Sequence, residues 1–273
     1  MRRALRVSSL TLPSGVTLPY AEQGDRSRTA LVLVHALADS WRIFEPVLGS
    51  LPESIHALAP TQRGHGDASK PAVGYRSTDF SADLLAFLDA LSIKSAVIAG
   101  ASSGGLVAPR FAIDHPERLS GLVLLGAPLR LGDKERVWRL WDDVISQLSD
   151  PVDPEFVRGF SEQIAQHVAP ALFETLVEES LKAPARVWQQ VYEGAMVDDF
   201  SAELNRISAP TLVLWGNRDS LLTREDEEIM VGEIPDARLV VYEGVGHLLY
   251  LEQPVRVAQD LADFMEALGL KER

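Results

Sequence analysis

Short apolar runs recur along the chain, and most of them are apolar on consecutive positions rather than on alternate ones. Such a run is typical of a strand buried on both faces, as in a parallel sheet covered by helices. The runs that predict strands of this kind are Leu31–Val34, Ile55–Ala59, Ala96–Ala99, Gly121–Leu125, Thr211–Trp215 and Arg238–Tyr242. Ahead of them, two alternating segments, Ala4–Leu12 and Val16–Glu22, flank Pro13-Ser14-Gly15 and predict an antiparallel hairpin.

Helical periodicity occupies intervals between these strands. In the segment Asp79–Leu91, leucines stand at positions 84, 85, 88 and 91, whereas aspartates take positions 83 and 89. This spacing places the leucines on one face of a helix. Leu106–Ile113 and Pro254–Leu268 are further predicted helices. The alternation of strand and helix predicts an α/β fold in which a mostly parallel sheet is flanked by helices.

The alternation stops from about Leu129 to Asn205. Strand patterns are absent from that stretch of sequence, and helical patterns are separated by Asp150-Pro151, Ala169-Pro170 and Ala183-Pro184. The strands resume afterwards. We therefore expect one core made of residues 1–128 and 206–273, with residues 129–205 inserted as a helical segment after the sixth strand.

Composition narrows the chemistry. The chain has 273 residues, no cysteine and a formal net charge of −13, so thiol nucleophiles and disulfides are excluded, and nucleic acid and anionic membranes are disfavoured as partners. The stretch after Arg6 contains no apolar core typical of an export signal. The apolar runs are far shorter than the roughly 18 residues of a membrane span. We expect a cytoplasmic globular protein.

The segment Gly100-Ala101-Ser102-Ser103-Gly104 follows the predicted strand Ala96–Ala99 and has the G-x-S-x-G pattern of a sharp strand-to-helix turn. Such a turn exposes the serine, needs small neighbours, and aims the N–H groups at the start of the next helix toward it. The pattern also resembles the phosphate loop of short-chain dehydrogenases. Against that alternative, Leu106 stands where the dinucleotide fingerprint has a glycine, and no tyrosine has a lysine four residues later.

A serine nucleophile needs a histidine base, and the base needs an acid that orients it. His247 is the best candidate, because Val245-Gly246-His247 follows the last predicted strand, and Asp219 follows the strand before it. Both positions are at strand carboxyl ends, as is Ser102. His56 in a strand, His115 near a helix end and His167 in the insertion are expected to be structural or solvated, and His35 and His65 lie in loops after strands. The order Ser102, Asp219, His247 is that of α/β-hydrolases.

From Gly15 to Leu268, the chain resembles α/β-hydrolase fold proteins with a helical lid. Besides the serine turn, the segments that carry the resemblance are Leu33–Ser40, Gln62–Pro71 and Gly246–Pro254. The resemblance implies a mostly parallel eight-stranded sheet flanked by helices, with residues 129–205 forming the helical cap. It also implies that the backbone N–H groups of Leu37 and Ser103 form an oxyanion hole. Ala36 replaces the usual glycine of the first segment, and Thr61 replaces a frequent aspartate.

The resemblance implies a serine hydrolase that cleaves carboxylic esters or lactones, needs no metal or organic cofactor, and exists as a monomer or homodimer. Ala36, Leu37, Trp138 and Trp141 are the residues expected to bind substrate. An apolar substrate of small to medium size is favoured by the aromatic residues of the insertion: Trp138, Trp141, Phe156, Phe160, Phe173, Trp188, Tyr192 and Phe200.

Several alternatives to this reaction stay open. Carbon–carbon bond hydrolysis and cofactor-free perhydrolysis or haloperoxidation use the same triad. A slow-turnover small-molecule receptor or a catalytically inactive binding module would have the same fold. The aromatic residues of the insertion could also do no more than pack it onto the core.

Overall fold

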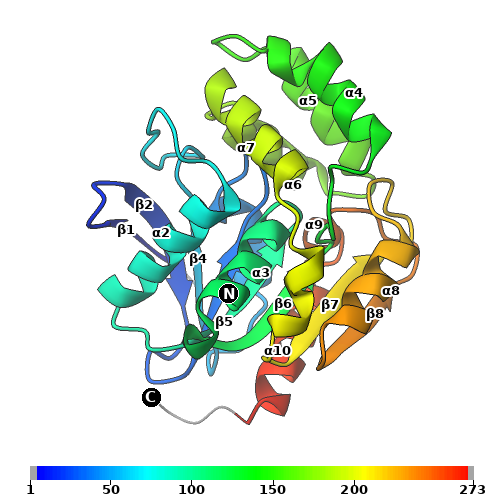
Figure 1. The fold of residues 1–273 in the computed structure, drawn as a ribbon. Helices are drawn as coiled ribbons and strands as arrows, with labels where there is room; N and C mark the ends of the chain where they lie inside the picture. The colour runs from blue at the N-terminus through cyan, green and yellow to red at the C-terminus, as the bar shows by residue number, and fades with distance from the viewer. Residues whose placement is uncertain (1–4, 270–273) are drawn as a thin grey trace.

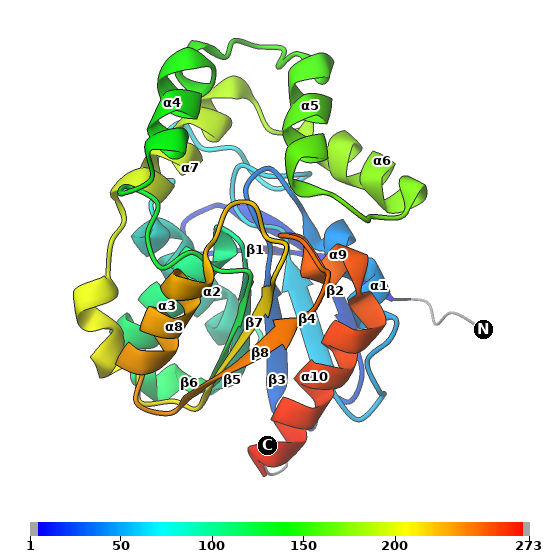
Figure 2. The same cartoon turned by 90° about the vertical axis from the view of Figure 1, so that its right-hand side faces the viewer.

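A computed structural model describes residues 5–269; Ala4 of the expected hairpin and the other terminal residues lie outside that range. An eight-stranded sheet runs through the molecule in the order β1-β2-β4-β3-β5-β6-β7-β8 (Figures 1 and 2). β1 and β2 pair antiparallel, β2 pairs antiparallel with β4, and every later pair is parallel. The strands are β1 Arg6–Thr11, β2 Thr17–Gln23, β3 Ala30–Val34, β4 His56–Pro60, β5 Ala96–Ala101, β6 Leu119–Leu125, β7 Thr211–Gly216 and β8 Ala237–Tyr242.

Helices cover both faces of the sheet, which explains why its central strands are apolar throughout. Along β6, Leu122 and Leu124 belong to one hydrophobic core, whereas Val123 and Leu125 belong to a second core on the opposite face. The first core is closed by α2 (Ser77–Ala90), α3 (Gly104–Asp114) and α8 (Arg224–Glu233); the second is closed by α1 (Glu45–Leu48), α9 (Leu249–Glu252) and α10 (Pro254–Ala267). The predicted mostly parallel, helix-flanked sheet is confirmed.

Between β6 and β7 the chain forms a group of helices that we call the inserted helices: α4 (Glu135–Asp143), α5 (Pro154–Ile164), α6 (Pro170–Ser180) and α7 (Ala185–Val197). They lie together beyond one edge of the sheet (Figure 2). α4 packs against α7, and α5 packs against α6. The short 3-10 turns are Trp41–Phe44, Pro116–Arg118, Ile145–Gln147 and Ser201–Arg206. Among residues 5–269, no helix is long and apolar enough to cross a membrane.

The parallel strands bring their carboxyl ends to one edge of the sheet. The segments that follow β3, β5, β7 and β8 therefore converge there, although they are far apart in sequence. These segments begin at His35, Ser102, Asn217 and Glu243. The fold thus places the predicted serine, acid and base on neighbouring loops beneath the inserted helices.

Candidate active site

Ser102 forms the sharp turn between β5 and α3. Its φ angle is +48°, in the left-handed region that costs a non-glycine residue energy. Two backbone bonds hold the turn: the Ser102 N–H donates to the Leu125 carbonyl at 3.0 Å, and the Gly105 N–H donates to the Ser102 carbonyl at 2.7 Å. The serine is therefore held in a strained conformation by the strand and the helix that flank it.

The glycines around Ser102 are required by close backbone contacts. A Cβ atom on Gly100 would lie 2.3 Å from the Gly104 carbonyl oxygen, and one on Gly104 would lie 2.5 Å from the Val34 oxygen and 2.6 Å from the His35 oxygen. A Cβ atom on a further glycine, Gly105, would lie 2.2 Å from the Ala127 Cβ, which leaves no room for a side chain there. The expectation that side chains would crowd this turn is confirmed.

Ser102, His247 and Asp219 form a continuous chain of hydrogen bonds. The Ser102 Oγ lies 2.8 Å from the His247 Nε2, and the His247 Nδ1 lies 2.8 Å from the Asp219 Oδ2. The other Asp219 oxygen, Oδ1, accepts the backbone N–H groups of Leu221 at 2.7 Å and Leu222 at 3.0 Å. Since the Asp219 side chain is fully buried and that of His247 is 2% exposed, water does not compete for these bonds.

The loop after β3 lies beside Ser102 and is held by His35. The buried His35 ring accepts the Gln62 backbone N–H on Nε2 at 2.9 Å, and its Nδ1 donates to the Ala36 carbonyl at 2.8 Å. Burial, and then the nearby His65, lower the pKa of His35 well below its usual value, so the ring is neutral. The same loop turns at Ala38, whose φ is +62°. His35 thus positions the backbone of this loop rather than serving as a base.

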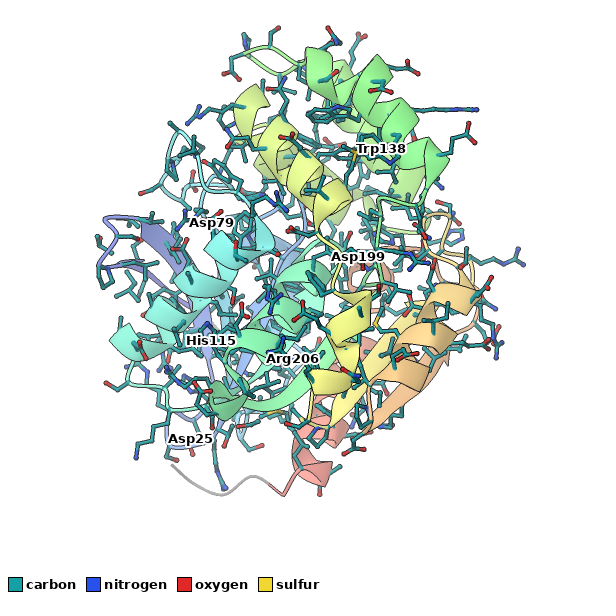
Figure 3. The ribbon with its side chains drawn as sticks, in the orientation of Figure 1. Asp25, Asp79, His115, Trp138, Asp199 and Arg206 are labelled. Carbon is teal, nitrogen blue, oxygen red and sulfur yellow. The ribbon has the colours of Figure 1, made fainter. Side chains whose placement is uncertain are left out.

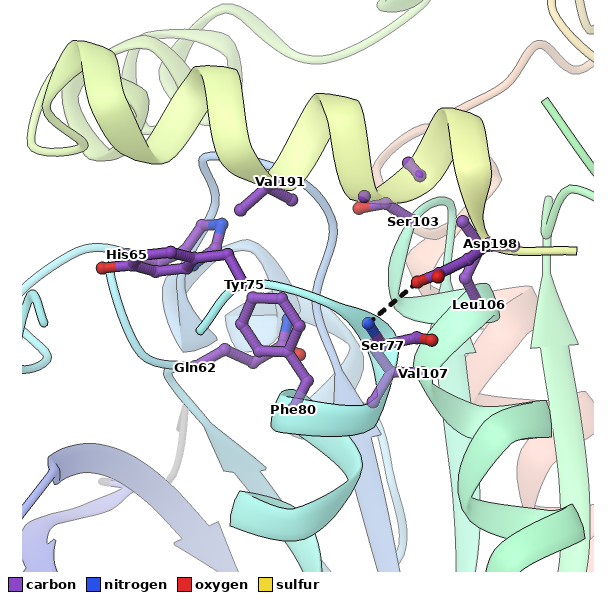
Figure 4. A pocket seen from close by; sticks show the side chains of 12 residues that line it. Gln62, His65, Tyr75, Ser77, Phe80, Ser103, Leu106, Val107, Val191 and Asp198 are labelled. Carbon is purple, nitrogen blue, oxygen red and sulfur yellow. Dashed lines mark hydrogen bonds between the residues drawn. The ribbon is translucent and has the colours of Figure 1, made fainter. Parts of the chain in front are cut away.

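His65 and Ser103 border a small cavity. The cavity, of about 20 Å³, lies under α7 and is bordered by His65, Ser103 and Phe80 (Figure 4). Burial lowers the pKa of His65 to about 4, and its Nδ1 donates to the Arg63 carbonyl at 2.7 Å. The other predicted non-catalytic histidines lie elsewhere: His56 contacts Glu22 at 2.9 Å, and His115 follows the end of α3 opposite Ser102 (Figure 3).

A cavity of about 120 Å³ opens above Ser102 between the core and the inserted helices. Ala36, Leu37, Ser102, Ser103 and His247 form its floor. Its walls are mostly apolar side chains of the insertion and neighbouring loops: Leu131, Val137, Leu140, Phe160, Ile164, Leu176, Val191, Tyr192, Ala195, Leu221 and Leu248. Apolar walls around a few polar groups are typical of a small-molecule site.

Trp138 and Trp141, which we expected to bind substrate, are not among the described residues that line this cavity. α4 presents Val137 and Leu140 to the cavity instead. Trp138 is turned outward, is 41% exposed and donates its indole N–H to the Gly132 carbonyl at 2.9 Å (Figure 3). Trp141 stacks on Tyr192 with ring centroids 6.4 Å apart. The correction follows from helical rotation, because residues one position apart face about 100° away from each other.

Other residues in the cavity wall have no signal in the sequence pattern. Asp39, Ser161 and Ser180 are buried polar examples. The motif Leu33–Ser40 contains Asp39, but nothing in its spacing distinguishes this aspartate from a turn residue. Thr61, the other departure from the family pattern, accepts the Trp41 N–H on its hydroxyl at 3.2 Å, so its role is structural. Within residues 5–269, no group of three or more histidines and acidic residues could hold a metal ion.

Comparison with known proteins places this site in context. Residues 31–260 match the model of the alpha/beta hydrolase family. The chain is 27% identical over 241 residues to 3-oxoadipate enol-lactonase 2 of Acinetobacter baylyi, covering 88% of this chain and 89% of that protein. It is 26% identical to lipase 3 of Moraxella sp., covering 97% and 86%. An esterase from Rhodococcus sp. ECU1013 has a similar structure, with TM-score 0.84, 26% identity and coverage of 96% and 99%.

Proposed function

Because the chain belongs to the alpha/beta hydrolase family, we propose that it is a serine hydrolase that cleaves carboxylic esters or lactones of small to medium, largely apolar substrates. The observation that carries this proposal is the unbroken Ser102–His247–Asp219 hydrogen-bond chain at the floor of an apolar cavity. The similarity to an enol-lactonase, a lipase and an esterase supports the same class of reaction.

The proton path follows from the hydrogen bonds. Ser102 attacks the carbonyl carbon of the ester as its hydroxyl proton passes to the His247 Nε2. Asp219 accepts the Nδ1–H of His247, which fixes the tautomer and stabilises the imidazolium. His247 then gives the proton to the leaving alcohol oxygen, and an acyl-enzyme remains on Ser102. Water deprotonated by His247 attacks the acyl carbon, and Ser102 recovers its proton when the acid leaves.

The negative charge that develops on the carbonyl oxygen needs donors near Ser102. We assign this role to the backbone N–H groups of Leu37 and Ser103. Both residues border the cavity beside Ser102. Neither N–H donates any of the loop and turn hydrogen bonds found in residues 5–269, so both are available to the substrate. Ser103 also precedes the start of α3, where the helix dipole favours negative charge.

Residues 129–205 are proposed to act as the cap that covers the substrate. Side chains from α4, α5, α6 and α7 all border the cavity. The insertion is tied to the core at Asp198, which follows α7 and accepts the Ser77 backbone N–H at 2.9 Å (Figure 4). A cavity of about 120 Å³ favours a short acyl chain or a single ring over a long fatty acyl group. The methyl group of Ala36 narrows the same space.

The test is a panel of 4-nitrophenyl esters of increasing acyl length, together with simple lactones. Each substrate is assayed with the wild type, with Ser102→Ala and with Ser120→Ala, whose side chain pairs with Ser95 away from the cavity. We expect steady-state turnover that falls by roughly six orders of magnitude in Ser102→Ala and is retained in Ser120→Ala. Activity on short acyl groups should exceed activity on long ones. Absence of any Ser102-dependent hydrolysis would contradict the proposal and favour the carbon–carbon hydrolase or receptor alternatives.

A further inference from the structure

Asp39 is a buried carboxyl group in the wall of the active-site cavity that the proton path does not use. The residue is 2% exposed and lies on the same loop as Ala36 and Leu37. Asp39 borders the same cavity as Leu37, Ser102 and Ser103. Asp39 is therefore close to the chemistry without belonging to the Ser102–His247–Asp219 chain.

The side chain of Asp39 has no hydrogen-bond or ion-pair partner among the residues that the structure describes. Asp219, by contrast, is held by His247, Leu221 and Leu222. Ser180, at the end of α6, resembles Asp39 in these properties. It lines the cavity, is 3% exposed, and its hydroxyl has no hydrogen-bond partner within the described chain. The neighbouring cavity serine, Ser161, has its hydroxyl bonded to the Val157 carbonyl at 2.9 Å.

A buried polar group without a hydrogen-bond partner is destabilising relative to a paired one. Two such groups from separate elements, facing one cavity whose other walls are mostly apolar, form a site with unused hydrogen-bonding capacity. An ester whose remaining atoms are all hydrocarbon would leave the Asp39 and Ser180 side chains without a partner. It would also exclude water that could otherwise hydrogen-bond to them. A substrate with a polar atom at this place would satisfy them.

The surroundings of Asp39 decide which kind of polar atom fits. Glu179, which precedes Ser180 in α6, is buried and paired with Lys182 at 2.9 Å and Arg42 at 3.6 Å. These two cations are engaged by Glu179, whose negative charge faces Asp39. Desolvation, and then the charge of Glu179, raise the pKa of Asp39 well above its usual value. A raised pKa favours the uncharged O–H form of the Asp39 carboxyl, which can donate a hydrogen bond to a neutral oxygen acceptor.

We propose that Asp39 and Ser180 bind an uncharged oxygen of the substrate, an ether or a ketone, distinct from the ester group that Ser102 attacks. This inference rests on the proposed function, since it concerns the substrate of the same site. It narrows the substrate class from apolar esters to esters or lactones that have a second, neutral oxygen acceptor. The oxygen accepts the Asp39 O–H, and the Ser180 hydroxyl donates to its other lone pair.

The experiment compares esters that differ only by an oxygen in place of a CH₂ group. With 4-nitrophenol as leaving group, the acyl pairs are methoxyacetate and butanoate, 3-methoxypropanoate and pentanoate, and 4-methoxybutanoate and hexanoate. On the alcohol side the pair is 2-ethoxyethyl acetate and pentyl acetate. The ratio of kcat/KM within each pair is measured for the wild type, Asp39→Asn and Asp39→Leu. Thermal unfolding of each variant shows whether it folds.

In at least one pair we expect the wild type to prefer the oxygen-containing ester, and Asp39→Leu to lower that preference by about tenfold or more. Asp39→Asn, whose amide is also an uncharged donor, should keep the preference within about threefold. Asp39→Leu should unfold at a temperature no lower than the wild type, because it removes an unpaired buried group. Ratios that are the same in all three proteins would overturn the inference.

Two further outcomes keep this inference distinct from the proposed function. If no ester in the series is hydrolysed in a Ser102-dependent way, the proposed function itself fails. If the esters are hydrolysed but a dimethylamino analogue of the preferred ether is the best substrate of the wild type and is lost in Asp39→Asn, then Asp39 binds a cation as a carboxylate. That result would overturn the neutral-oxygen assignment while leaving the hydrolase in place.

Discussion

The loops at the carboxyl edge of the sheet and the inserted helices above them contribute to one cavity in different ways. In the loops, close backbone contacts and hydrogen bonds determine which residue fits each position. A Cβ on Gly104 would meet carbonyl oxygens, and the two carboxylate oxygens of Asp219 bind the Leu221 N–H and the His247 ring. In the inserted helices, the packing of side chains determines which residue fits each position; Trp188, for example, contacts Phe156 and Phe160 edge-on. We therefore expect the loops to determine the reaction and the insertion to determine which substrates reach them.

After Ser102→Ala, the largest effect on activity should come from the acid on the loop after β7. Asp219→Asn preserves the size of the side chain but stabilises the wrong tautomer of His247, and we expect kcat on the best ester to fall about 10⁴-fold. Steady-state kinetics measure this loss, and circular dichroism verifies the fold. Asp133→Asn, on the surface beside Arg130, is the control and should retain activity. A loss below tenfold in Asp219→Asn would show that this acid is dispensable.

The second prediction separates packing from contact with substrate within the inserted helices. Trp188 is fully buried, whereas Trp138 is 41% exposed and lies outside the cavity wall. Trp188→Ala should lower the free energy of unfolding by about 3–5 kcal/mol because it leaves a large void. Trp138→Ala should change it by less than about 1 kcal/mol and leave KM for aryl esters within about twofold. A large rise of KM in Trp138→Ala would restore that residue as a substrate contact.

Glycine substitutions test the backbone argument directly. Gly104→Ala places a methyl group against the Val34 and His35 carbonyl oxygens, so we expect a loss of about 3 kcal/mol or more of unfolding free energy in urea. Gly159 is in the interior of α5 with no atom within 4 Å of its added Cβ. Gly159→Ala should stabilise the protein by about 0.5–1 kcal/mol. Equal changes of unfolding free energy in Gly104→Ala and Gly159→Ala would show that backbone contacts constrain the loops no more than the inserted helices.

A pH titration of stability tests the buried histidines beneath the loops. The pKa of His65 is about 4 in the folded chain and about 6.5 when unfolded. Between these two pH values the unfolded chain binds more protons than the folded chain, so the unfolding free energy rises with pH. The stabilisation contributed by His65 is therefore lost as the pH falls from about 6.5 to about 4. This contribution is about 3 kcal/mol. His35 acts in the same direction.

The measurement is urea unfolding between pH 4 and pH 7.5. His65→Asn should give a visibly flatter dependence than the wild type, because an amide does not titrate in this range. His167→Asn, on the exposed surface of the insertion, is the matched control for replacing a histidine. If the curves of the wild type and His65→Asn run parallel, the lowered pKa of His65 is wrong.

Sequence patterns alone predicted the strands, the candidate residues Ser102, Asp219 and His247, and the resemblance to the family, which the family match confirms. These features follow from local rules: a continuous apolar run is a buried strand, a glycine-flanked serine at its end forms a turn, and parallel strands share one carboxyl edge. The bounds of predicted elements shifted slightly, as where α3 begins at Gly104 rather than Leu106, and the short helices α1 and α9 were not predicted.

Which side chains face the cavity, and which polar groups have partners, follows from the packing of segments that are distant in sequence. Trp138 and Trp141 looked equivalent to Val137 and Leu140 in composition, but the rotation of α4 against α7 turned the valine and leucine inward. The raised pKa of Asp39 comes from its burial and then from the charge of Glu179, 140 positions away along the chain. Contacts between segments so distant are set by packing of the whole molecule, because local spacing contains no information about them.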